Sequence, residues 1–121
     1  MNRTSNIKQR FAAAIERLDG DVDLLCEMAA ITAPDCPAVL EQIESSLGQG
    51  ECESAAAPLH KLKGMLSTFD ADGVALEIQE MLEHARRGHL QELRQSFDQH
   101  QHEIVQLIDE IRGLAGASQQ S

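Results

Sequence analysis

The chain has 121 residues, with 20 acidic and 10 basic side chains and a formal net charge of −10. It contains neither Trp nor Tyr. An acidic chain without these aromatic rings is a poor match for nucleic acid or for an anionic membrane surface, so we expect neither as a partner.

The length suits one domain, which we expect to cover residues 1–121, with a core over about 7–112 and mobile ends at 1–6 and 113–121. The three cysteines are an odd number at wide spacing, and no signal peptide or long apolar run follows Met1. We therefore expect a reduced, cytoplasmic protein, and we expect it to be a monomer.

Apolar residues recur at spacings of three and four along most of the chain, which predicts helices. The first is a short helix over about residues 7–18 that ends at Gly20. Asp21 is placed to cap a second helix, and two prolines predict a break near residues 32–37. A further helical segment follows at 38–47.

Three more helices are predicted over about residues 51–68, 74–85 and 90–114. Short connections favour antiparallel neighbours. We therefore expect an all-α fold, an up-and-down antiparallel four-helix bundle with a short additional N-terminal helix. Pro58 removes one backbone hydrogen bond from its helix, which predicts either a bend just before His60 or irregular N-terminal turns.

The helix at 51–68 carries a stripe of Leu59, Leu62 and Leu66 that should be buried. At about 100° per residue, the side chain of His60 points roughly 100° or more away from all three leucines. Its imidazole should therefore face water. Most exposed histidines on helices are ordinary solvated side chains, and this interpretation stays open from position alone.

The neighbours of His60 favour a more specific interpretation. Lys61 and Lys63 are two of only three lysines in the chain. Gly64 lacks a side chain one turn away, which leaves room for another surface to approach. A neutral imidazole is a nucleophile near neutral pH, so His60 is a candidate phosphoryl acceptor, with Lys63 to screen the added charge.

Residues 60–64 (His-Lys-Leu-Lys-Gly) resemble the His-x-Leu-Lys-Gly signature of histidine-containing phosphotransfer (HPt) domains. The resemblance implies a helical bundle in which His60 is the phosphoacceptor, supported by Lys63 and Gly64. It also implies a protein of a two-component phosphorelay, which takes a phosphoryl group from a receiver-domain phospho-aspartate and passes it to another receiver. The implied partners are response-regulator receiver domains and a hybrid histidine kinase.

Two alternatives stay open beside this relay function. One is the chemotaxis-kinase subtype, whose phosphoacceptor domain is phosphorylated by a histidine kinase and has a carboxylate beside the histidine. The other is a helical interaction module without chemistry.

The sequence has no Gly-rich phosphate loop or kinase ATP motif, so we expect a phosphotransfer intermediate and not an enzyme with its own ATP site. The chemotaxis subtype would assign Glu83 as a hydrogen-bond acceptor for the imidazole of His60, but its spacing from His60 is one residue longer than that subtype implies, so we expect Glu83 to be solvated surface.

We expect no cofactor and no metal site in this chain. Glu53 is the only carboxylate on the helical face of His60, so the Mg²⁺ that relay chemistry needs is expected on the partner receiver. The other four histidines lack the spacing of a metal site. Among them, His100 falls on the apolar stripe of the last helix and is expected to be a partly buried core residue.

Overall fold

The computed structural model describes residues 9–118, and every regular element in this range is a helix. The α-helices are α2 (Ala12–Arg17), α3 (Val22–Thr32), α4 (Cys36–Gly48), α5 (Ala56–Ser67), α6 (Val74–Arg86) and α7 (Leu90–Ser118). Two 3₁₀ turns, η1 (Ala33–Asp35) and η2 (Glu53–Ala55), precede α4 and α5. No described helix combines the length and apolar character that crossing a membrane requires.

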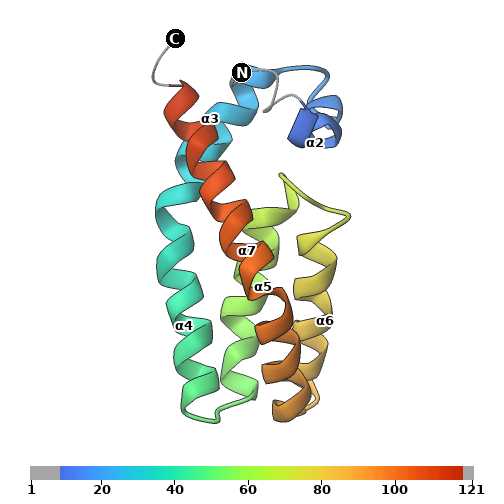
Figure 1. Cartoon of the computed structure of the whole chain (residues 1–121), viewed down its shortest axis with the longest axis vertical. Helices are drawn as coiled ribbons and strands as arrows, with labels where there is room; N and C mark the ends of the chain where they lie inside the picture. The colour runs from blue at the N-terminus through green and yellow to red at the C-terminus, as the bar shows by residue number, and fades with distance from the viewer. Residues whose placement is uncertain (1–8, 119–121) are drawn as a thin grey trace.

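Helices α4, α5, α6 and the first half of α7 lie side by side and alternate in direction (Figure 1). They form the antiparallel four-helix bundle that the sequence predicts. The second half of α7 extends past this bundle and packs along α3. The short helix α2 packs against α3 at the same end of the molecule. The predicted all-α bundle with an additional N-terminal helix is confirmed.

The turn between α2 and α3 follows the predicted chemistry. Asp19 and Gly20 have φ angles of 56° and 82°, a left-handed conformation that ends a helix and that glycine adopts without strain. The side chain of Asp21 then caps α3, because its Oδ1 accepts a 2.9 Å hydrogen bond from the Leu24 amide. Helix α2 begins only at Ala12, and the part of the expected helix before residue 9 lies outside the described residues.

Prolines decide where two of the helices begin. The predicted break near residues 32–37 is confirmed as the 3₁₀ turn η1, with Pro37 in the first turn of α4. Pro58 is the third residue of α5, where the missing amide hydrogen would have no partner within the helix. Of the two outcomes expected for Pro58, the structure shows irregular N-terminal turns. The helix expected from residue 51 is therefore α-helical only from Ala56.

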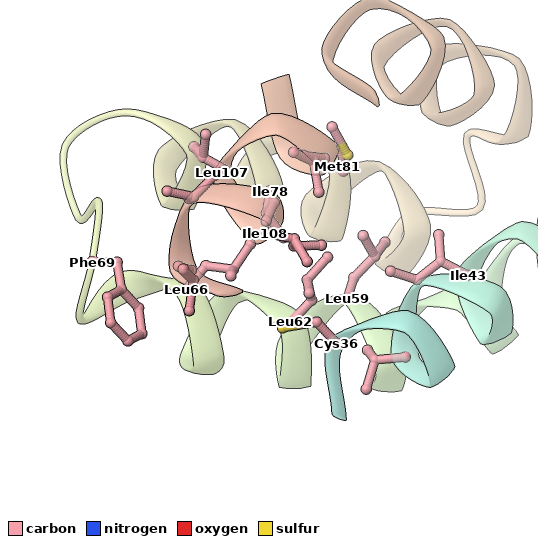
Figure 2. Close-up of a cluster of buried hydrophobic side chains, with 14 of the residues drawn as sticks. Cys36, Ile43, Leu59, Leu62, Leu66, Phe69, Ile78, Met81, Leu107 and Ile108 are labelled. Carbon is pink, nitrogen blue, oxygen red and sulfur yellow. The ribbon is translucent and has the colours of Figure 1, made fainter. Parts of the chain in front are cut away.

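The core of the bundle is centred on the leucine stripe of α5. Leu59, Leu62 and Leu66 are each 0% exposed, as expected. Burying each of these side chains contributes about 1.5–3 kcal/mol to the stability of the fold. Figure 2 shows them among buried side chains of the neighbouring helices, which include Cys36, Ile43, Ile78, Met81, Leu107 and Ile108.

Helix α7 is longer than predicted. The core was expected to end near residue 112, with a tail from Gly113, but α7 continues to Ser118 and Leu114 is 0% exposed. Each glycine inside a helix costs about 1 kcal/mol relative to alanine. Burial of Leu114 recovers about 1.5–3 kcal/mol, which explains why the helix passes through Gly113. Residues 1–8, which include the expected N-terminal end, and 119–121, the last three residues of the expected tail, lie outside the described range.

Candidate functional site

His60 is the fifth residue of α5, and its side chain is exposed. Its chain neighbour Leu59 is fully buried, so the backbone anchors α5 in the core while the imidazole projects from the bundle. Within residues 9–118, no hydrogen bond or ion pair engages the ring. Another molecule can therefore reach the exposed ring without first displacing a hydrogen bond or ion pair of the described residues.

Lys63 follows His60 by three residues on α5, so the two side chains are neighbours on one helical face. Lys63 is half-buried, and its Nζ donates a 2.6 Å hydrogen bond to Oε1 of Gln79 on α6. This contact was not expected from the sequence. It holds the ammonium group at the junction of α5 and α6, whereas Lys61 is exposed.

Gly64 is exposed, and a Cβ atom added to it would have no other atom within 4 Å. The fold therefore does not require glycine there, although glycine costs about 1 kcal/mol in a helix interior. Gly113 on α7 is equally open, so the open space alone does not single out Gly64. What distinguishes Gly64 is its position one turn from His60, because a side chain at Gly64 would lie beside the imidazole.

Glu83 lies on α6, one turn beyond Gln79. Helices α5 and α6 run antiparallel, and Lys63 contacts Gln79. One turn forward along α6, from Gln79 to Glu83, therefore corresponds to one turn back along α5, from Lys63 to His60. Glu83 is exposed, and it makes no hydrogen bond to His60 in the described part of the chain. A carboxylate is thus present on the neighbouring helix at this level of the bundle without orienting the imidazole.

A second group of polar side chains lies between α6 and α7. One ligand atom from each of Glu77, His100 and Glu103 lies within 4.8 Å of the others. His100 is partly buried, with 17% of its side chain exposed, as expected. The sequence does not predict this grouping, because Glu77 comes from a different helix than His100 and Glu103. The only sequence signal is the spacing of three between His100 and Glu103 on α7.

An antiparallel helical bundle that presents a histidine beside a lysine and a glycine has the features of a phosphotransfer module. The model of the Hpt domain family matches residues 27–117, which is well over half of the chain. The chain therefore belongs to the Hpt domain family. Hpt domains are phosphotransfer intermediates of phosphorelays that exchange phosphoryl groups with receiver domains, and they are not ATP-using kinases. No curated protein and no solved structure matches the chain.

Proposed function

We propose that His60 accepts a phosphoryl group on Nε2 from the phospho-aspartate of one receiver domain and passes it to the aspartate of another. The exposed imidazole, which no described residue engages, carries this proposal, and it lies inside the stretch matched by the family. The Nε2 lone pair attacks phosphorus, an N–P bond forms, the P–O bond to aspartate breaks, and the carboxylate leaves with the bonding electrons. The second transfer reverses these changes.

Lys63 stabilises the transferred group in this proposal. Its ammonium has three N–H donors, and one of them is engaged by Gln79. Two donors remain for phosphoryl oxygens on the face that Lys63 shares with His60. Because the charge is already held in place, little reorganisation is needed when the phosphoryl group arrives.

Gly64 gives the receiver access to His60. A receiver must bring its aspartate within bonding distance of Nε2, which requires its surface to approach the helix closely. The open space over Gly64 permits that approach. The contact is expected to bury no more than the ~1,200–2,000 Å² of ordinary interfaces, as suits transient signalling.

The receiver supplies the Mg²⁺ ion. Helix α5 contains no Asp or Glu, Glu53 lies before it in η2, and Glu83 is the α6 carboxylate one turn beyond Gln79, the partner of Lys63. Mg²⁺ prefers octahedral oxygen geometry and usually more than one carboxylate or phosphate ligand. The surface around His60 therefore contributes the nucleophile and a positive charge, and the acidic pocket belongs to the partner.

Transfer from a receiver that carries a radiolabelled phospho-aspartate tests the proposal. Label should appear on the wild-type chain and on His102→Gln, a matched variant with an exposed histidine replaced on α7. It should be absent from His60→Gln. Label that persists in His60→Gln would overturn the assignment of His60. Labelling only by a histidine kinase with ATP would favour the chemotaxis subtype, and equal receiver binding by both variants without any label would favour a non-catalytic interaction module.

A further inference from the structure

Three side chains on the α6–α7 face form a cluster that phosphotransfer from His60 does not use. His100 Nδ1 lies 3.3 Å from Glu77 Oε2 and 3.9 Å from Glu103 Oε1. His100 and Glu103 project from the same side of α7 because they are three residues apart, and Glu77 faces them from α6. The grouping thus joins two helices through one nitrogen and two carboxylates.

Two atoms of this cluster lack a hydrogen-bond partner. Glu77 Oε2 and His100 Nδ1 are buried, and neither has a hydrogen-bond partner in the described part of the chain. No lysine or arginine forms an ion pair with Glu77 or Glu103 within residues 9–118. A buried polar atom without a partner costs about 1–3 kcal/mol. The two atoms lie 3.3 Å from each other, and Glu103 is the only other charged group that forms an ion pair with them within residues 9–118, so a bound cation would satisfy both atoms at once.

We infer that Glu77, His100 and Glu103 bind a Zn²⁺ ion, with water as a fourth ligand. Zinc binds His nitrogen and carboxylate oxygen at about 2.0–2.2 Å, which places neighbouring ligand atoms of a tetrahedral site about 3.3–3.6 Å apart. The separation of 3.3 Å between His100 Nδ1 and Glu77 Oε2 already fits that geometry. Glu103, at 3.9 Å, needs only a small rotation of a side chain that is 53% exposed.

The ligand set distinguishes among metal ions. An imidazole nitrogen suits zinc and other transition metals, whereas Mg²⁺ and Ca²⁺ prefer oxygen ligands only. The two carboxylates balance the charge of a divalent ion. The chain also carries a net charge of −10, which favours cation binding in general.

The zinc site is separate from the phosphotransfer face. Gln79, which contacts Lys63 on α5, lies two residues from Glu77 on α6, so the two side chains point to nearly opposite sides of the helix. The bound ion would tie α6 to α7 and leave His60 free. Its effect is to stabilise the folded chain, because the unfolded chain cannot hold the three ligands together.

Calorimetric titration of the metal-free full chain with Zn²⁺ tests this inference. One ion should bind per chain, and the melting temperature should rise with Zn²⁺ concentration. Replacing a residue that only hydrogen-bonds to a metal ligand lowers metal affinity by about 10–100-fold. His100→Ala and Glu103→Gln each remove a ligand, so each should weaken Zn²⁺ binding by at least about tenfold. His102→Ala, on the same helix, is the matched control and should bind as the wild type does.

Glu103→Gln keeps the test decisive if His100→Ala folds poorly, since Glu103 is mostly exposed. Cobalt replaces zinc in a second measurement, because its absorption spectrum separates thiolate from nitrogen and oxygen ligands. No thiolate bands are expected, although the chain has three free cysteines. Absence of one-to-one binding, thiolate bands, or unchanged affinity in Glu103→Gln would overturn the inference.

Discussion

Nζ of Lys63 on α5 donates a 2.6 Å hydrogen bond to Oε1 of Gln79 on α6. A free lysine side chain loses about 1.5–2 kcal/mol of rotamer entropy when it is fixed in one position. The contact with Gln79 and the half-burial of Lys63 fix it before any partner arrives. In the proposed mechanism, the bond between the two helices therefore positions the charge beside His60.

Lys63→Ala should slow transfer to His60 by about tenfold or more, because a pre-positioned donor acts on the charge that develops during transfer. Receiver affinity should change by less than about fivefold, since surface charges contribute only about 0–1 kcal/mol. Stopped-flow transfer rates and a receiver titration measure the two effects. Lys61→Ala is the control, and Gln79→Leu should cause a smaller loss of rate. Equal rates for Lys63→Ala and Lys61→Ala would contradict the role of Lys63.

Gly64→Ala should raise the free energy of unfolding by about 1 kcal/mol, because alanine favours the helix and nothing lies within 4 Å of its Cβ. Gly64→Gln should weaken receiver binding, because its side chain occupies the approach to His60. Gly113→Ala, at an equally open position on α7, should stabilise the chain without affecting binding. Chemical denaturation and a receiver titration measure both properties. Unchanged affinity and transfer rate in Gly64→Gln would exclude the proposed access role.

Glu77 predicts a pH dependence of stability. Burial raises the pKa of its carboxyl group, and the neighbouring Glu103 raises this pKa further. The positive charge of His100 lowers it, but by less. The folded chain therefore holds this proton more tightly than the unfolded chain. In metal-free protein, the free energy of unfolding should fall as the pH rises from the ordinary glutamate pKa of 4.5 through the raised pKa of Glu77.

The variant Glu77→Gln lacks this titration, so its stability relative to the wild type should increase over the same pH interval. Urea unfolding in EDTA at several pH values measures the difference. Glu83→Gln removes an exposed carboxylate from the same helix, so its free energy of unfolding should change with pH as that of the wild type does. A constant difference between Glu77→Gln and the wild type across this interval would show that Glu77 is not perturbed.

Magnesium should act on the partner and not on this chain. Calorimetry of the isolated chain with Mg²⁺ should show no specific binding, because the surface around His60 has too few carboxylates. Transfer between the chain and a receiver should stop with EDTA and return with excess Mg²⁺. Glu103→Gln should behave identically, which separates this effect from the zinc site. Tight Mg²⁺ binding by the isolated chain would contradict the division of roles.

The sequence predicts the helical bundle and the exposure of His60 because both depend on local periodicity. Leu59 and Leu62 face the core and His60 faces water for the same reason, the 100° rotation per residue. The residues at which the helices begin are less predictable from the sequence. Pro58 was compatible with a bend or with irregular turns, and only the packed structure shows that α5 begins at Ala56.

Contacts between helices were not predictable from the sequence. The bond from Lys63 to Gln79 and the approach of Glu77 to His100 depend on the register of α6 against its neighbours. That register is set by core packing and by the connections between helices, which periodicity does not encode. The family signature at 60–64 therefore predicts which residues matter for transfer, but not what holds Lys63 in place.

The most direct test of the central claim is to map the phosphoryl group on the chain after reaction with a phosphorylated receiver. Mass spectrometry of the intact chain at neutral pH should show the addition of one phosphoryl group, and fragmentation should place it on His60. Nuclear magnetic resonance of the phosphorylated chain should assign it to Nε2. A phosphoryl group on any of the other four histidines, or none on a chain that still binds the receiver, would contradict the account.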